Sequence, residues 1–515
     1  MSAENNIPDS WQRSTLPDCC TIVLGQSPSS ATYNTEGKGL AFFQGKAEFG
    51  PLYPTPGCWC SDPSKVAEPD DVLLSIRAPV GPTNLAPARC CIGRGLAAIR
   101  PNGGILNRFM LYAFRSIEKN LDELGTGTTF KAITGSVLRS LSIPVAPVRE
   151  QRRIVEEIDK QFTRLDAGVA ALKRVEANLR RYKAAVLKAA VEGRLTQRWR
   201  AEHPDVEPPS ELLKRILTER RRRWEQAQLA KMQAKGKPPT DDRWKKKYKE
   251  PIVPEPEALP RLPTGWKWVT LGQLCLVQQG FSKSPRRAPT ENVHPYLRVA
   301  NVLRGRLDLA DVQPIRLFEG ELETMRLQRG DLLIVEGNGS KSEIGRSALW
   351  NGEIADCVHQ NHIIRARAII AWAAFIDAYW NSPPGNSAVM AAASSTSGLY
   401  TLSVSKVSAL PVPLPPLAEQ QAIVNEVEER LSSLAAAEEA VTTGVRRASR
   451  LRQSILKRAF EGKLVPQDPT DEPASVLLDR IRSQRAAEEP RRARSGPGVK
   501  RVPRRKTAKS GLTRR

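Results

Sequence analysis

Two short segments of the chain are close to loops that handle bases or phosphates. Residues 382–385 (Ser-Pro-Pro-Gly) resemble the loop with which an amino-methyltransferase grips a flipped base, but glycine stands where an aromatic ring should stack. Residues 337–342 (Gly-Asn-Gly-Ser-Lys-Ser) lack the glycine that precedes the lysine of an ATP-binding loop. Both segments therefore predict turns and not catalytic loops.

Acidic, cysteine and histidine residues form two further clusters. A metal-dependent nuclease needs grouped acids followed by a spaced lysine, whereas Asp70 and Asp71 precede an apolar strand and are interpreted as turn residues. Cys357, His359 and His362 form one metal-like cluster, but zinc sites need four ligands and no second cluster accompanies it. We expect no metal and no catalytic residue in this chain.

Positive charge is concentrated in two segments. The chain has 79 basic and 55 acidic residues among 515, a net charge of +24, and residues 214–249 and 480–515 carry +10 and +12 of it. The second segment is expected to be a disordered tail, either attracting DNA without sequence preference or solvated with no specific role. Its basic residues include Arg491, Arg492, Lys500, Arg504, Arg505 and Lys506. Specific recognition must then come from the nearly neutral remainder.

Neither a membrane span nor a disulfide framework is indicated. The most apolar segment, residues 369–380, is too short to cross a bilayer and contains Asp377, and the first 14 residues lack the apolar core of a signal peptide. Eight cysteines in so long a chain are expected to be reduced and mostly buried. We expect a soluble cytoplasmic protein.

An internal repeat organises the sequence. Residues 144–195 align without a gap on residues 413–464, and 17 of the 52 pairs are identical. Weaker matches precede it (Trp11 with Trp266) and follow it (residues 210–216 with 475–481). The chain is therefore predicted to contain two tandem copies, each with a globular part and a long helix.

The repeated segment has the pattern of a coiled coil. Pro144 and Pro147 end a strand and set the entry to a helix, which Gly193 and Gly462 are predicted to cap at its C-terminus in the two copies. Apolar residues recur every seven positions, as a left-handed coiled coil requires. They are Ile158, Leu165, Leu172, Leu179 and Val186 in copy one, flanked by Val155, Phe162, Val169, Val175 and Tyr182, and Val427, Leu434, Val441, Ala448 and Ile455 in copy two. The alternatives are that the two helices pair, which we favour, or that each packs on its own globular domain.

The globular parts predict a mixed α/β, or α+β, fold. Residues 72–76, 96–99, 332–335 and 362–366 are expected as strands, and residues 109–115 and 373–380 as short helices. The predicted organisation is a first domain (1–143), a first long helix (144–197), a basic helical and proline-rich linker (198–262), a second domain (263–412), a second long helix (413–465) and a C-terminal segment (466–515). An antiparallel helix pair would make this a pseudo-two-fold tandem repeat.

This layout resembles the specificity subunit of type I restriction–modification systems. The matching segments are Ile143–Gln151, Leu414–Gln420, Leu73–Gly81, Ile92–Gly95 and His359–Arg365, together with the Glu-Gly-Arg-Leu and Glu-Gly-Lys-Leu helix ends. The resemblance covers roughly residues 10–480. It implies two target recognition domains that read one half each of a bipartite site in double-stranded DNA.

The resemblance also implies partners. The chain itself would be non-catalytic and would dock two methyltransferase subunits, which bind S-adenosylmethionine and methylate adenine at N6, and ATP- and Mg-dependent restriction subunits. Glu150, Gln151, Glu419 and Gln420 of the helix entries would join the heptad residues in helix pairing and subunit docking.

Base reading requires side chains that match the donors and acceptors of the grooves, arginine for guanine and asparagine or glutamine for adenine. In the first domain the candidates are Arg77, Asn84 and Arg94, and in the second Asn338, Ser340, Lys341, Arg346, His359, Gln360 and Asn361. Each has an alternative: Arg77 pairs with a buried carboxylate, or Asn338 caps a glycine-rich turn.

Paired helices predict a fixed gap in the DNA site. Domains at opposite ends of the pair would meet one face of DNA about 34–36 Å apart, so a heptad added to both helices should lengthen the gap. A stand-alone enzyme is disfavoured by the incomplete motifs. A coiled-coil scaffold without DNA specificity does not explain two dissimilar domains on duplicated helices.

Overall fold

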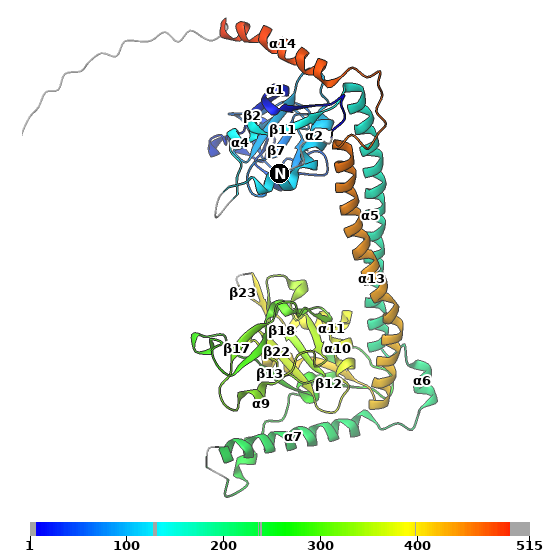
Figure 1. Cartoon of the computed structure of the whole chain (residues 1–515). Coiled ribbons are helices and arrows are strands. Elements are labelled where there is room, and N and C mark those ends of the chain that lie inside the picture. Colours follow the sequence, from blue (N-terminus) through cyan, green and yellow to red (C-terminus); the bar gives the residue numbers. More distant parts are fainter. Residues whose placement is uncertain (1–6, 127–130, 235, 237–238, 397, 495–515) are drawn as a thin grey trace, which may run out of the picture. The chain divides into compact units, whose positions relative to one another are not determined.

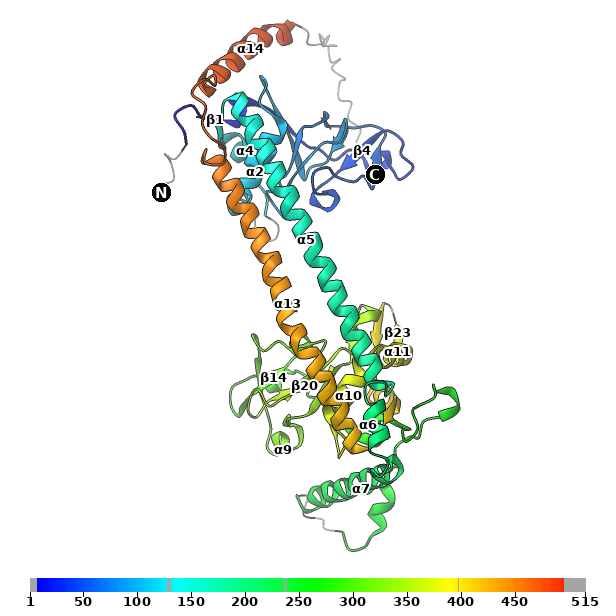
Figure 2. The same cartoon turned by 90° about the vertical axis from the view of Figure 1, so that its right-hand side faces the viewer.

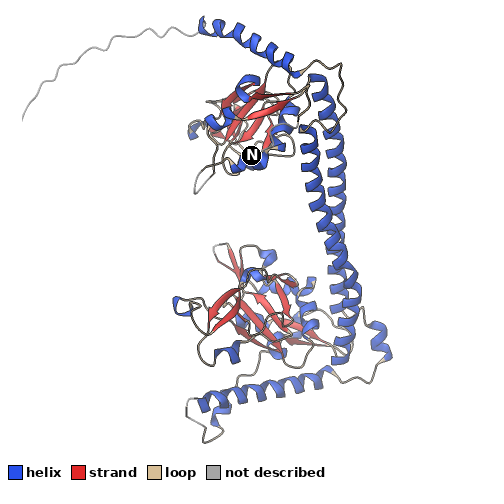
Figure 3. Ribbon diagram, in the orientation of Figure 1, coloured by secondary structure: helices blue, strands red, loops and turns tan. Residues whose placement is uncertain are grey.

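The structure, a computed structural model, describes residues 7–126, 131–234, 236, 239–396 and 398–494. It divides into two compact units, unit 1 with residues 1–172 and 443–515 and unit 2 with residues 173–442. Each unit contains one globular domain and part of each of the two long helices. The fold is α+β (Figure 3).

A four-stranded antiparallel sheet forms the centre of the domain in unit 1. Its strand order is β2 (Cys20–Leu24), β10 (Leu96–Pro101), β7 (Val72–Ser75) and β8 (Thr83–Leu85). The strands β7 and β10 are apolar runs buried on both faces, as expected for a sheet covered on two sides. Beside it lie the pair β1 (Gln12–Thr15) and β11 (Ser142–Val145) and a five-stranded sheet of β3 (Tyr33–Asn34), β5 (Trp59–Cys60), β4 (Leu40–Phe43), β9 (Cys90–Ile92) and β6 (Val66–Ala67).

The domain of unit 2 repeats this topology. Its central sheet has the order β13 (Cys275–Gln279), β22 (Ile363–Ala368), β18 (Asp331–Val335) and β20 (Ser347–Trp350), again antiparallel throughout. The parallel pair β4–β9 of unit 1 has its counterpart in β14–β21. The remaining strands are β12 (Lys267–Thr270) with β25 (Pro411–Leu414); β17 (Gln313–Arg316), β14 (Val293–Leu297) and β21 (Val358–His359); β15 (Val302–Leu303) with β16 (Arg306–Leu307); and β19 (Gly337–Asn338), β24 (Leu399–Thr401) and β23 (Ser394–Thr396).

Short helices cover the sheets in both units. In unit 1 these are α1 (Leu16–Cys19), α2 (Asn107–Ser116), α3 (Glu118–Glu123) and α4 (Gly135–Ser140); in unit 2 they are α8 (Leu271–Leu274), α9 (Glu321–Met325), α10 (Ala373–Trp380), α11 (Pro383–Ala392) and α12 (Val404–Ala409). Every predicted strand and short helix of the globular parts has an element at its position. The two-domain prediction from weak sequence similarity is therefore confirmed at the level of sheet order.

The two long helices are α5 (Val148–Val191) and α13 (Leu417–Phe460). In unit 1 the start of α5 packs with the end of α13, since Ile158 and Leu456 belong to one buried cluster and Leu172 contacts Gly444. In unit 2 the end of α5 packs with the start of α13 through Val186 and Val427 (Figure 2). Within each unit the two helix segments thus run in opposite directions.

The helices contact each other and also the domain of the unit. Ile158 and Val186 are buried, and Leu165, Leu172 and Leu179 are half-buried. In copy two Val427 and Val441 are buried, and Leu434, Ala448 and Ile455 are half-buried. The prediction was wrong for Val175 and Tyr182, whose side chains are 43% and 46% exposed, because they lie one position before the second core position of their heptads. The helices therefore pack in both of the ways that the sequence left open: each contacts the other helix and also the globular domain of the unit.

Glycine caps end both helices as predicted. Gly193 has a φ of 68° and Gly462 a φ of 69°, in the left-handed region. The amides of Gly193 and Arg194 donate to the carbonyls of Ala190 and Ala189, the pattern of a Schellman cap.

The predicted linker is partly a packed element. After α6 (Gln197–Glu202), the helix α7 (Pro209–Ala234) buries Leu212, Leu213 and Ile216 in the core of unit 2. Its counterpart α14 (Ala474–Arg494) buries Leu477, Leu478 and Ile481 in the core of unit 1 (Figure 1). The expectation of disorder is wrong for Arg491 and Arg492, which belong to α14, whereas Lys500, Arg504, Arg505 and Lys506 lie outside the described residues.

All eight cysteines are free thiols, and Cys58 alone is not buried. Within the described residues, no helix is long and apolar enough to cross a membrane.

Candidate nucleic-acid interface

In each domain, a turn leads into an inner strand of the four-stranded sheet, β10 in unit 1 and β22 in unit 2. In unit 1 the turn joins β9 to β10, and the carbonyl of Ile92 accepts from the amide of Gln26 at 3.0 Å. In unit 2 the turn joins β21 to β22, and the carbonyl of His359 accepts from the amide of Phe281 at 2.9 Å. The turns of residues 92–95 and 359–362, called the central turns below, therefore occupy the same place in the fold.

The backbone register makes Arg94 and Asn361 equivalent. Arg94 lies two residues before β10, and Asn361 lies two residues before β22. The residue that precedes each of them, Gly93 or Gln360, donates its amide to the neighbouring parallel strand. Arg94 is exposed and Asn361 is half-buried. Among the described residues neither side chain makes a hydrogen bond or an ion pair, so both have free donors. One arginine and one amide at the same position suit different bases.

Arg77 lies two residues after the end of β7, next to the central turn of unit 1. The residue before it, Ile76, donates its amide to the carbonyl of Gly95 in the central turn at 2.9 Å. Arg77 is exposed, and no carboxylate of the described part of the chain pairs with it. The alternative in which Arg77 neutralises a buried carboxylate is therefore wrong.

Asn84 is a structural residue, and its prediction as a base reader is wrong. Its side chain is 1% exposed. The amide group clamps Gly50, accepting from its N–H at 3.0 Å and donating to its carbonyl at 2.9 Å. Because the oxygen and the nitrogen of this side chain are both bonded to Gly50, 34 residues away, they are not free to contact a base.

The loop after β18 presents exposed polar residues. The Oδ1 of Asn338 accepts from the amide of Ser340 at 2.8 Å, which is the turn-capping alternative. Ser340 and Lys341 are exposed, and Lys341 has no ion-pair partner among the described residues. Ser340 and Lys341 therefore stay candidates, while Asn338 has a structural role.

Arg346 does not belong to this interface. Its Nε donates to the carbonyl of Val302 at 2.7 Å and its guanidinium also donates to the carbonyl of Val299 at 3.0 Å. These bonds hold two segments of the domain together, so the prediction of DNA contact by Arg346 is not met.

His359 is buried, so its prediction as a base reader is also wrong. Its side chain is 0% exposed, its Nδ1 lies 3.1 Å from the carbonyl of Ile363, and burial lowers its pKa to about 4. The imidazole is therefore neutral near pH 7 and is packed inside the domain, against the carbonyl of Ile363 at the start of β22. Gln360 is half-buried, with Oε1 3.4 Å from the amide of Val299.

The metal-like cluster does not assemble. Burial raises the pKa of the Cys357 thiol to about 12, which keeps it protonated. His362 is exposed and lies 3.4 Å from a carboxylate oxygen of Glu336. In the part of the chain that the structure describes, no group of three or more His, Cys, Asp or Glu side chains is arranged to hold a metal ion.

The other motif residues have structural partners. The hydroxyl of Ser382 caps α11 by accepting from the amide of Gly385 at 3.2 Å, so residues 382–385 are a helix start. Asp71 is 1% exposed and bound by both arms of the Arg100 guanidinium at 2.8 Å. Asp70 has a φ of 64°, as in a turn.

The glutamates of the helix entries are buried, not available for docking. Glu150 accepts from the indole N–H of Trp11 at 2.9 Å and from Gln467 at 2.5 Å. Glu419 repeats this bond with Trp266 at 2.9 Å and adds Thr196 at 2.7 Å. Each glutamate thus binds the first strand region of its domain and the segment that follows the other long helix.

The neighbouring glutamines fasten the helix to a short helix of the domain. Gln151 accepts from the amide of Leu106 at 3.0 Å, and Gln420 accepts from the amide of Trp372 at 3.0 Å. Both glutamines are fully buried. Subunit docking by Glu150, Gln151, Glu419 and Gln420 is therefore wrong, whereas a role in seating the helices is supported.

Two exposed glutamines at the central turn of unit 1 were not predicted from the sequence. Gln26 follows β2, and Gln44 follows β4 and lies against Gly93. The signal was the glycines at positions 25, 93 and 95. A side chain at 25 or 95 would collide with neighbouring backbone, and Gly93 lies close against Phe42 and Gln44. In unit 2 the position of Gln44 is taken by Arg298, which pairs with Asp311 at 2.6 Å.

Known proteins share this sequence pattern. Residues 8–173 match the family model described as the type I restriction modification DNA specificity domain. The putative type I restriction enzyme MjaX specificity subunit of Methanocaldococcus jannaschii is 44% identical over 155 residues, which are 30% of this chain and 36% of that protein. The type I restriction enzyme EcoKI specificity subunit of Escherichia coli is 26% identical over 442 residues, covering 82% of this chain and 83% of that protein.

Two solved structures are also similar. The HsdS subunit from Thermoanaerobacter tengcongensis has 49% identity, covers 31% of this chain and 39% of that chain, and has a TM-score of 0.29. The type I restriction–modification S subunit from M. genitalium has 15% identity, covers 91% and 99% of the two chains, and has a TM-score of 0.34.

Residues 8–173 belong to the DNA specificity domain family of type I restriction–modification systems. Curated relatives that align with most of the chain, such as the EcoKI and StySPI specificity subunits, are specificity subunits of type I restriction enzymes.

Proposed function

We propose that this chain reads a bipartite, asymmetric site in double-stranded DNA, one half with each domain. The observation that carries the proposal is the equivalence of the two central turns. The same backbone position holds Arg94 in one domain and Asn361 in the other, on sheets of the same strand order. Two domains of one architecture with different edge residues suit two different half-sites.

The long helices would set the gap between the half-sites. Each is a continuous helix of 44 residues, with parts in both units. Helix seating by Glu150 and Glu419 supports this role, because it ties each domain to both helices.

The catalytic steps would take place on other subunits. The chain would dock two methyltransferase subunits, which supply S-adenosylmethionine-dependent methylation of adenine, and restriction subunits that use ATP and Mg. The exposed apolar side chains of Val175 and Tyr182, seven residues apart on α5, support docking along that helix. The setting would be the cytoplasm.

Methylation profiling tests this function. Long-read sequencing would compare a host that expresses this chain with its neighbouring methyltransferase subunit and a host that expresses the methyltransferase alone. We expect a new bipartite adenine-methylated motif in the first host only. Absence of a new motif, with both proteins soluble and co-purifying, would contradict the proposal.

A further inference from the structure

The far part of α7 and the segment that packs back on it form a basic arm, defined here as residues 219–234 and 239–249. At its base, α7 is fixed to unit 2 by Leu212 and Ile216 and by Arg220, which donates to the carbonyl of Gly272 at 2.9 Å. Beyond this base the helix continues to Ala234 away from the sheets of unit 2 (Figure 1). The arm is thus an anchored projection and not a free linker.

Three aromatic rings hold the returning segment against the helix. The rings of Trp224 and Trp244 stack with their centroids 5.9 Å apart, and the ring of Tyr248 meets Trp224 edge-on at 5.2 Å. Arg221 lies over the ring of Tyr248 and Lys245 over the ring of Trp244. Because the rings pack on one another, the lysines between and beside them are held in a defined arrangement.

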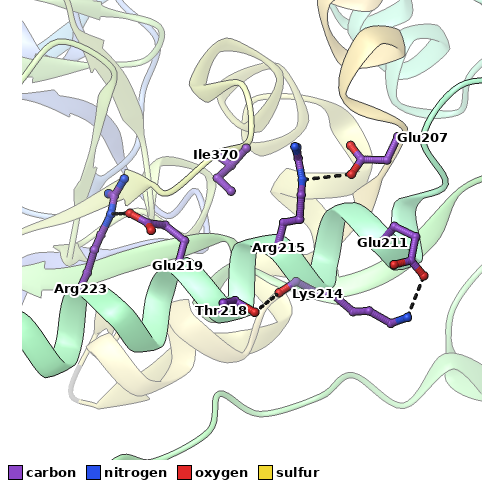
Figure 4. A pocket seen from close by; sticks show the side chains of 8 residues that line it. All are labelled: Glu207, Glu211, Lys214, Arg215, Thr218, Glu219, Arg223 and Ile370. Atoms are coloured by element: carbon purple, nitrogen blue, oxygen red, sulfur yellow. Dashed lines mark hydrogen bonds and ion pairs between the residues drawn. The ribbon is translucent and has the colours of Figure 1, made fainter.

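Most cations at the base of the arm have carboxylate partners. Arg222 and Arg223 both bind Glu219, at 2.6 and 2.7 Å. Just before the arm, Arg215 binds Glu207 and Lys214 binds Glu211 (Figure 4). Residues 219–225 contain four arginines and two glutamates, so this part of α7 keeps a net charge of +2, but three of its four arginines have a carboxylate partner.

In the returning segment, Arg243 and Lys245 pair with Asp241 and Asp242, but three further lysines do not. Lys246, Lys247 and Lys249 are exposed, and no carboxylate of the described residues lies within ion-pair distance of them. Three lysines within four residues, without ion-pair partners in the described part of the chain, therefore lie beside the packed rings.

We propose that the basic arm binds phosphates of the DNA duplex beside the half-site that unit 2 reads. This inference rests on the proposed function. Lysine is a point charge suited to phosphate, and contacts to phosphate add affinity without sequence information. A protein partner fits less well, because lysine is depleted from protein interfaces and the aromatic side chains that would anchor one are packed against each other.

Salt-dependent binding of DNA tests the arm. The full chain and a variant with Lys246→Gln, Lys247→Gln and Lys249→Gln would be titrated against a labelled duplex without the recognition site over a range of KCl concentrations. Loss of two or three phosphate contacts should reduce the slope of log affinity against log salt by about 2 and weaken binding at low salt by roughly tenfold or more. The half-site requirement of methylation should stay the same.

Two matched variants separate the arm from net charge. Lys457→Gln, Arg458→Gln and Lys463→Gln remove the same charge from exposed residues elsewhere, and should change the slope much less. Trp224→Ala keeps the charge but releases the returning segment, and should weaken binding in the same direction as the lysine variant.

Equal effects of the two charge variants, or no effect of the arm lysines, would overturn the inference. Loss of co-purifying methyltransferase with unchanged DNA binding would overturn it in favour of a protein partner. A wild-type chain with no site-specific binding would instead contradict the proposed function itself.

Discussion

Replacing Asp331 by alanine is expected to lower the free energy of unfolding of the second domain by about 3–5 kcal/mol. Asp331 is fully buried and accepts from Arg367 at 2.6 and 2.7 Å and from the amide of Gln328 at 2.8 Å. The Arg367 side chain is only 19% exposed. Removing the carboxylate leaves this guanidinium uncompensated and the turn before β18 without its acceptor.

Hydrogen exchange measured by mass spectrometry locates this effect. Peptides that cover β18 and β22 should lose protection, because the ion pair joins these central strands. Asp311→Ala is a matched control, since Asp311 forms a similar pair with Arg298 at 2.6 Å but is 69% exposed; it should cost under about 1 kcal/mol. The double variant Asp331→Ala with Arg367→Ala should recover part of the loss. A shift of under 1 kcal/mol for Asp331→Ala would contradict the account.

The second large effect concerns specificity. Arg94→Ala is expected to relax the base requirement at one position in one half of the methylated motif, and Asn361→Ala to relax one position in the other half. A good bidentate contact to a base is worth about 1–3 kcal/mol of discrimination, or roughly 5- to 150-fold. Both side chains lie at equivalent central turns and have no partner among the described residues.

Methylation profiling of each variant tests this prediction. Each variant is a control for the other, because it should change only its own half of the motif. Arg89→Ala gives a further control, because Arg89 is an exposed arginine of the first domain that already pairs with Glu68 at 3.5 Å. It should leave the motif unchanged. Relaxation of both halves by either variant, or of neither half by both, would contradict the assignment of one central turn to each half-site.

Most of the architecture follows from local sequence. Strand β7 is an apolar run, α5 begins directly after Pro147, and Gly193 ends it in the left-handed conformation. Local rules sufficed because these features depend on the periodicity and backbone preferences of neighbouring residues.

The site was less predictable, because the fate of a polar side chain depends on partners distant in sequence. Asn84 binds Gly50, and His359 is fully buried in a strand that pairs with β14, about 60 residues away in the sequence. Nor was the equivalence of Arg94 and Asn361 visible, since the two central turns have no residue in common. Only the backbone hydrogen bonds reveal it.

The C-terminal segment gives a similar lesson. Residues 475–481 repeat the pattern of residues 210–216, and their apolar side chains Leu477, Leu478 and Ile481 pack on unit 1. The basic composition after residue 480 predicted disorder, but the helix continues to Arg494. Arg485 also donates to the carbonyl of Cys20 at 2.5 Å, as Arg220 of α7 does to Gly272 in unit 2. A short stripe within a charged segment was enough to make a docked helix.

Exchange of one domain tests the central claim most directly. Residues 20–140 would be replaced by the corresponding domain of a specificity subunit that reads another site, and DNA methylated by the hybrid with its methyltransferase would be profiled. We predict a motif in which one half changes and the other half stays identical. A motif that is unchanged, or that changes in both halves, would contradict a division of DNA reading between the two domains.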